Sequence, residues 1–244
     1  MLYRILFVGL VAGFVAGLAM AAMQQAKIVP LIAAAEVYEA AAEPHDAAME
    51  HAHGMAGEAA EWQPAAGFQR ISLTYLADLI VAIGFGLALS GSFAIRQAVS
   101  GRVPDAREGL LWGAAGFAAF ALAPALGLPP EPPGMVSADI YARQGWWLGT
   151  AFATCAGLGL AVFGRAWLAR IAGLVLLVLP HLIGAPARPA GNDAVTAAIA
   201  AHFVAASLVT SAVFWAVLGL SAGWLYAAME KSRDALARHP RATT

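Results

Sequence analysis

Long stretches without charged side chains recur along this chain, and their spacing constrains the fold more than any other feature. A helix needs about 20 largely uncharged residues to cross a bilayer. Six such spans are expected: Ile5 to Met23, the region between Arg70 and Arg96, Leu110 to Leu128, Gly145 to Gly164, Trp167 to Gly184, and Phe203 to Ala228 preceded by an interfacial helix. The sequence therefore predicts an all-α, polytopic transmembrane bundle of five to six spans, with residues 1–244 forming one membrane domain.

The composition narrows the partners and the class of function. Of the 244 residues, 61% are apolar and 12% are charged, which is about half the charged share of a soluble domain. The net charge is −1, and the chain has neither a basic stripe nor a GxxxxGK[ST] phosphate loop. We therefore expect membrane lipid as a partner, no nucleic acid, no nucleotide and no permanently bound cofactor. The expected class is a transport or structural membrane protein and not an enzyme.

The distribution of Lys and Arg predicts the orientation in the membrane. If the N-terminus is cytoplasmic, ten basic residues lie inside: Arg4, Arg96, Arg102, Arg107, Arg165, Arg170, Lys231, Arg233, Arg238 and Arg241. Four lie outside: Lys27, Arg70, Arg143 and Arg188. Cytoplasmic loops carry the excess of basic residues, so both termini are expected inside, including a tail over residues 230–244. Residues 41–67 and 129–145 then form outer loops.

The first span carries a ridge of small residues, because Gly9, Gly13 and Gly17 are spaced four apart. Such a ridge lets another helix approach closely, so these glycines are candidates for helix packing. The run before the small residues also resembles a cleavable signal peptide. Its 19 residues exceed the usual apolar region of a signal peptide, which favours a retained span.

Two outer segments are rich in residues that fix the backbone or anchor at an interface. In "GLPPEPPGM" the prolines cannot continue a helix, so Glu131 is held in a rigid, extended loop. The paired Trp residues of "RQGWW" are typical of an aromatic belt at the membrane surface. The candidates for a structural or partner-docking role are Pro129, Pro130, Arg143, Gln144, Trp146 and Trp147, together with Pro180 and Gly184 of "PHLIGAP".

Ionisable residues within or beside the spans are candidates for a metal site. Asp78, Glu131, His181 and His202 come from four segments and are expected at one level of the membrane. Imidazole and carboxylate are ligands that a divalent ion such as Co²⁺, Ni²⁺ or Zn²⁺ accepts. Pro180 also frees the carbonyl of Leu176. The alternative is that Asp78 pairs with a nearby hydroxyl and each His hydrogen-bonds a backbone carbonyl.

A second cluster of metal-ligating residue types lies in the long outer loop. Its members are His45, Asp46, Met49, Glu50, His51 and His53. In a helix, His45, Met49 and His53 would share one face and could hold an ion loosely. The Ala- and Glu-rich surroundings, without a specific ligand pattern, favour a solvated loop without a fixed structure. The functional alternative is a low-affinity capture site for metal.

Several segments together resemble the CbtA family of bacterial cobalt transporter subunits. They are "ADLIVAIGFGLALSG", "GLLWGAAGFAAFALAPALGLPPEPPGM", "RQGWWLGT", "PHLIGAP" and "FWAVLGLSAGWLY", and the likeness extends over nearly the whole chain. The resemblance implies a multi-pass protein of the bacterial inner membrane that serves cobalt supply for cobalamin. It also implies a small, single-span, CbtB-like partner with a His-rich end.

Three functions fit these features of the sequence. The first is a permease component that provides or supports the path of a transition-metal cation, with cobalt as the expected ion. The second is an assembly subunit that docks a metal-transport partner without an ion path of its own. The third is a redox protein with His181 and His202 as haem ligands, and two His are too few to favour it.

Overall fold

The structure is a computed structural model that describes residues 1–42 and 67–238. Every regular element in these ranges is helical. In chain order the elements are α1 (Leu2–Met23), η1 (Gln24–Ile28), α2 (Val29–Ala42), α4 (Phe68–Ser100), α5 (Ala106–Phe117), η2 (Ala118–Leu122), α6 (Ala123–Ala125), α7 (Ile140–Phe163), α8 (Trp167–Ile183) and α9 (Ala197–Arg238). The prediction of an all-α fold is confirmed.

Five helices of the described ranges are long and apolar enough to cross a membrane. They cover Leu2–Ala41, Phe68–Ser100, Ala106–Ala125, Ile140–Phe163 and Ala197–Arg233. Helix α8 is also apolar but has only 17 residues. At 1.5 Å per residue it is about 25 Å long, shorter than a hydrocarbon core of about 30 Å. The predicted range of five to six spans is therefore confirmed.

Two of these long helices contain a turn of π-helix just before a proline. The turn η1 precedes Pro30, and the turn η2 precedes Pro124. A proline inside a helix lacks a donor and crowds the preceding turn, and a wider π-turn accommodates that change without ending the helix. The first helix consequently continues to Ala42, well beyond its predicted end at Met23.

The last helix differs from the prediction. The sequence predicted an interfacial helix followed by a separate span from Phe203, whereas the structure has one 42-residue helix, α9. No proline or glycine occurs between Ala197 and Phe203, so nothing in the sequence breaks the helix there. His202 therefore lies within the first turns of α9 and not at a junction between two helices.

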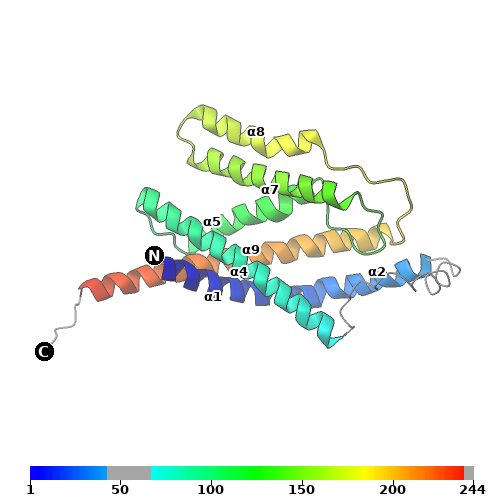
Figure 1. The fold of residues 1–244 in the computed structure, drawn as a ribbon, viewed down its shortest axis with the longest axis horizontal. Helices are drawn as coiled ribbons and strands as arrows, with labels where there is room; N and C mark the ends of the chain where they lie inside the picture. The colour runs from blue at the N-terminus through cyan, green and yellow to red at the C-terminus, as the bar shows by residue number, and fades with distance from the viewer. Residues whose placement is uncertain (43–66, 239–244) are drawn as a thin grey trace, which may run out of the picture. The chain divides into compact units, whose positions relative to one another are not determined.

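The chain divides into two compact units. Unit 1 comprises Met1–Ala22, Thr74–Ala121 and Thr210–Thr244. Unit 2 comprises Met23–Leu73 and Leu122–Val209. Unit 1 thus contains most of α1 and α4, α5 and the larger part of α9, while unit 2 contains α2, α7, α8 and the start of α9 (Figure 1).

Unit 1 is held together by close helix contacts at glycines. Helix α1 lies against α4 so closely that a Cβ atom added to Gly13 would be 2.6 Å from the Cα atom of Ile83. Helix α5 lies against α9 in the same manner, and a Cβ atom on Gly223 would be 3.0 Å from the Cα atom of Gly109. Glycines let helix backbones approach within van der Waals contact, and such packing is one of the forces that drive helix association in lipid.

Aromatic side chains fill the middle of unit 1. The ring centroids of Phe85 and Trp215 are 4.9 Å apart, and those of Phe85 and Phe120 are 5.0 Å apart. The ring of Phe120 also stacks on Trp215 at 5.7 Å. These edge-on and stacked arrangements are the favourable ones for aromatic rings, so α4, η2 and α9 share one packed core.

Helices α7 and α8 lie side by side in unit 2 (Figure 1). Gly157 of α7 and Gly173 of α8 face each other, and a Cβ atom on Gly173 would be 2.6 Å from the Gly157 carbonyl oxygen. Thr150 and Thr154 are buried on α7. The long connections before α7 and after α8 belong to the same unit and carry most of its ion pairs.

Candidate functional site

Glu131 is the centre of a polar network in unit 2. Its side chain is only 9% exposed. One carboxylate oxygen lies 2.9 Å from the Arg143 guanidinium and accepts a 2.6 Å hydrogen bond from the Ser137 hydroxyl. The other oxygen is 3.8 Å from the guanidinium of Arg188. Two cations and a hydroxyl therefore satisfy the charge of a mostly buried carboxylate.

The same network joins the two loops that flank α7 and α8. Arg188 pairs with Asp193 at 2.6 Å and donates a 2.6 Å hydrogen bond to the Val136 carbonyl. Asp193 in turn accepts a 2.9 Å hydrogen bond from the Val136 amide. Two carboxylates and two guanidinium groups balance in charge, so the network braces the loops without a net charge of its own.

A pocket of about 200 Å³ adjoins this network. Its lining includes Gly127, Pro129, Glu131, Met135, Arg188 and Val204. The prolines restrict the backbone of its wall, while Glu131 and Arg188 contribute opposite charges to its lining. A divalent ion could bind Glu131 there only after the carboxylate gave up its contacts with Arg143 and Arg188.

His181 lies beside Trp146, with ring centroids 6.0 Å apart in an edge-to-face arrangement. The Trp146 indole also packs tightly on Gly127, and its buried N–H has no hydrogen-bond partner among the described residues. Pro180 is buried inside α8, and Gly184 ends that helix with a φ of 87°, a left-handed conformation that favours glycine. The structure thus brings the "RQGWW" and "PHLIGAP" segments together.

The other predicted metal ligands are distributed over both units. Asp78 is half-buried on α4 in unit 1, whereas Glu131, His181 and His202 belong to unit 2. His202 is exposed on α9. Within the described ranges, no three side chains of His, Cys, Asp or Glu lie close enough to hold one metal ion. The predicted capture residues at positions 45–53 lie outside the described residues.

The remaining docking candidates occupy the surface and rim of unit 2. Pro129 and Gln144 are exposed, while Pro130 and Trp147 are half-buried. Helix α7 begins at Ile140 with Asp139 as its cap, which accepts a 2.9 Å hydrogen bond from the Ala142 amide. This cap fixes where α7 begins, and therefore the direction in which the Arg143 side chain extends from the helix toward Glu131.

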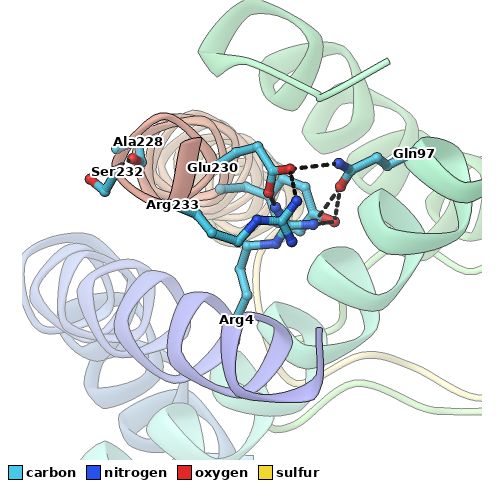
Figure 2. A network of polar contacts seen from close by, with 7 residues as sticks. Arg4, Gln97, Ala228, Glu230, Ser232 and Arg233 are labelled. Carbon is cyan, nitrogen blue, oxygen red and sulfur yellow. Dashed lines mark hydrogen bonds and ion pairs between the residues drawn. The ribbon is translucent and has the colours of Figure 1, made fainter. Parts of the chain in front are cut away.

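The sequence alone did not predict the roles of Arg188, Asp193 and Ser137. The pairing of Arg188 with Asp193 could have been predicted, because opposite charges five residues apart in a Pro- and Gly-rich loop can pair locally. A second network was also missed in unit 1, where buried Arg4 pairs with buried Glu230 (Figure 2). This pair could have been suspected from the sequence, because the expected topology placed the two opposite charges on the same side of the membrane.

The comparisons with known proteins agree with this architecture. A family model named CbtA, described as a probable cobalt transporter subunit, matches residues 2–227. No curated protein and no solved structure matches the chain. Because the match extends over nearly all of the 244 residues, the chain belongs to the CbtA family of probable cobalt transporter subunits.

Proposed function

We propose that this protein is a membrane subunit of a bacterial cobalt uptake system and that it provides or supports the path of the ion. The observation that carries the proposal is the family match over residues 2–227, found on a chain with five long apolar helices. We further propose the inner membrane as its location and cobalamin synthesis as the process that it supplies. Cobalt is the transported substrate, and no permanently bound cofactor is required.

The proposed orientation places both termini in the cytoplasm. The contacts of Arg4 with Gln97 and Glu230 put the start of α1 and the ends of α4 and α9 at the same end of unit 1. Basic residues gather at or beside this end, namely Arg4, Arg96, Arg102, Arg107, Lys231 and Arg233. An excess of Lys and Arg is typical of cytoplasmic loops, which supports this orientation.

Asp78 and His181 are the residues that we propose for the ion path, with Glu131 and His202 as accessory ligands. Asp78 supplies a negative charge within a long apolar helix. Placing a carboxylate within a membrane span costs free energy, so such residues usually have a function. His181 supplies the nitrogen ligand that favours cobalt over magnesium or calcium, which prefer oxygen. The proposal requires only that the ion meet these ligands in succession, with water completing its shell.

The second candidate function is an assembly subunit that docks a metal-transport partner. The observation that favours it is the braced surface formed by Glu131, Arg143, Arg188 and Asp193 around the adjoining pocket. A rigid, charge-balanced surface with aromatic residues nearby suits recognition of another membrane protein. A small CbtB-like subunit with a His-bearing end is the partner that we propose in either reading.

The replacement Asp78→Asn separates the two functions, because it removes the charge and keeps the shape. In the ion-path reading, radiolabelled cobalt uptake per molecule should fall at least about tenfold, as expected for loss of an electrostatic contribution of roughly 1.4 kcal/mol. Asp139→Asn is the matched control, since Asn caps a helix as well as Asp does and uptake should stay unchanged.

The assembly reading predicts the opposite pattern in the same assay. Asp78→Asn would then retain uptake through the partner, and Arg143→Gln would lose it together with co-purification of that partner. Protein abundance in the membrane is measured in parallel for each variant. Full uptake by Asp78→Asn would therefore contradict the ion-path proposal and support docking.

A further inference from the structure

Three helices of unit 1 meet at the end of the unit where α4 is followed by α5. Gln97 of α4 donates a 3.2 Å hydrogen bond to Glu230 of α9, so these two helices lie together there (Figure 2). Arg96 of α4 pairs with Glu108 of α5 at 3.1 Å, which holds the start of α5 beside the end of α4. Charged residues from all three helices are therefore collected at one end.

The carboxylates at this end are engaged by the protein itself, whereas several cations are not. Glu230 pairs with both Arg4 and Arg233. Asp105 caps α5 and accepts a 2.9 Å hydrogen bond from the Glu108 amide. Three cations are exposed and have no ion-pair partner in the described ranges, and together they form the basic face: Arg102, Arg107 and Lys231.

The turn that carries two of these cations is held in place by the fold. Pro104, in the turn between α4 and α5, is fully buried. The carbonyl oxygen of Asp105 lies against Gly223 of α9. Gly223 comes eight residues before Lys231, which is about 12 Å along the helix. The turn and its two arginines are therefore fixed beside the helix that carries the third cation.

Arg107 occupies an unfavourable position in its own helix. It is the second residue of α5 (Ala106–Phe117). The first turn of a helix carries a partial positive charge, so a cation placed there reduces the stability of the helix. Helix stability therefore does not account for this arginine, whereas an anion bound beside it would.

We propose that the basic face binds the phosphate headgroup of an anionic phospholipid. The guanidinium groups of Arg102 and Arg107 and the ammonium group of Lys231 carry the charge opposite to that of the headgroup. Each of them can donate hydrogen bonds to phosphate oxygens, and hydrogen bonds between ionised groups are the strong ones.

A lipid suits the basic face better than a soluble anion because of where this face lies. The apolar helices Phe68–Ser100 and Ala106–Ala125, which are long enough to cross a membrane, end and begin beside it. The ends of membrane spans lie at the level of the headgroups, where anionic lipids attract flanking basic residues. On α1, Leu2 and Tyr3 directly precede Arg4 and are 69% and 72% exposed, so they offer apolar surface to acyl chains at the same end.

The test measures thermal unfolding of the purified full chain in a neutral detergent, with phosphatidylglycerol or phosphatidylcholine added at equal concentration. Phosphatidylglycerol should raise the Tm by roughly 3–5 °C more than phosphatidylcholine, as expected for a ligand at about ten times its Kd. Each lost cation should weaken binding about fivefold, so the triple variant Arg102→Gln, Arg107→Gln, Lys231→Gln should lose this excess. No excess in the unaltered protein, or an excess that persists in the triple variant, would overturn the proposal.

The triple variant Lys27→Gln, Arg70→Gln, Arg165→Gln is the matched control, because it removes three exposed cations from other parts of the chain. Its net charge equals that of the first triple variant, but its basic face is intact. The excess shift with phosphatidylglycerol should therefore remain. An equal loss in both triple variants would show that net charge alone governs the lipid affinity and would overturn the site.

The single variant Arg107→Gln should change two measurements in different directions. Without lipid it should be at least as stable as the unaltered protein, because it removes a cation from the first turn of α5. The excess shift with phosphatidylglycerol should nevertheless fall. A lower Tm without lipid, or an unchanged lipid-induced shift, would contradict the proposal.

Inorganic phosphate at the same concentration separates a lipid headgroup from a free anion. It should raise the Tm by less than half as much as phosphatidylglycerol does, because it lacks the acyl chains that contact the apolar helices. An equal rise would assign the basic face to a soluble phosphate and would overturn the lipid assignment.

Discussion

Glu131 shows how a single side chain can organise a whole end of unit 2. The sequence indicated that Glu131 is held rigidly among prolines. In the structure, the guanidinium groups of Arg143 and Arg188 both lie next to its carboxylate. A mostly buried carboxylate that loses a cation keeps the cost of its burial without the compensating attraction. The burial of Glu131 therefore makes Arg143 contribute more to the stability of the protein than an ordinary surface arginine does.

The replacement Arg143→Gln should destabilise the protein by about 1–3 kcal/mol, because Glu131 would keep only its hydroxyl partner and the more distant Arg188. Arg70→Gln is the matched control. Arg70 pairs with Glu36 at 2.9 Å, but the side chains are 53% and 43% exposed, and exposed pairs contribute only about 0–1 kcal/mol. Thermal unfolding in detergent measures the stability of both variants. Equal losses of stability in the two variants would contradict the structural role assigned to Glu131.

Helix packing in unit 1 depends on glycines at two helix pairs. The α1–α4 pair uses the row that begins at Gly9, and the α5–α9 pair uses Gly109, Gly113, Gly219 and Gly223. In both pairs the backbones meet so closely that no side chain fits between them. These contacts fix which helices are neighbours within the unit.

The replacement Gly13→Ala should weaken the α1–α4 contact, because the new methyl group would meet the backbone of Ile83 at 2.6 Å. Backbone cannot move aside as a flexible side chain does, so we expect a loss of roughly 1–3 kcal/mol. Gly84→Ala is the control on α4, since nothing lies within 4 Å of the added atom. Alanine should leave stability unchanged there or raise it by up to about 1 kcal/mol. Similar Tm losses in the two variants would contradict the packing.

The helices were largely predictable from the sequence, while several of their ends were not. Runs without charge located the apolar helices because a bilayer excludes charged side chains. The prediction ended the first span at Met23 and so missed that the π-turn η1 carries the helix past Pro30, and it divided the single helix α9 into an interfacial helix and a span. Gly109 and Gly113 have the same spacing as Gly9 and Gly13, so the glycine contact between α5 and α9 could have been predicted in the same way.

The polar sites were predictable only in part, because pairing depends on which loops meet. Pattern alone selected Glu131 and Arg143 separately, and the structure pairs them. The partners Arg188 and Asp193 come from a loop more than 50 residues away in the chain, and Arg4 and Glu230 come from opposite ends. Contacts over such separations require the tertiary arrangement, which periodicity and composition do not contain.

At the scale of the whole molecule, the orientation in the membrane is open to direct measurement. Reporter fusions after Arg102 and after Arg233 should report the cytoplasm, and a fusion within residues 54–60 should report the periplasm. The reason is the distribution of ten basic residues on one side and four on the other. A periplasmic signal after Arg102 would reverse the assignment and place the Glu131 network on the cytoplasmic side.

Cobalt uptake in cells shows directly whether this chain works as a subunit of cobalt transport. Radiolabelled cobalt accumulation is measured in cells that express the chain alone, the proposed small membrane partner alone, or both, with an excess of magnesium to expose selectivity. We expect uptake above background only in cells that contain this chain, with the highest rate when both proteins are present and little competition from magnesium. Equal uptake with the partner alone and with both proteins would contradict the assignment of this chain as a functional subunit of cobalt transport.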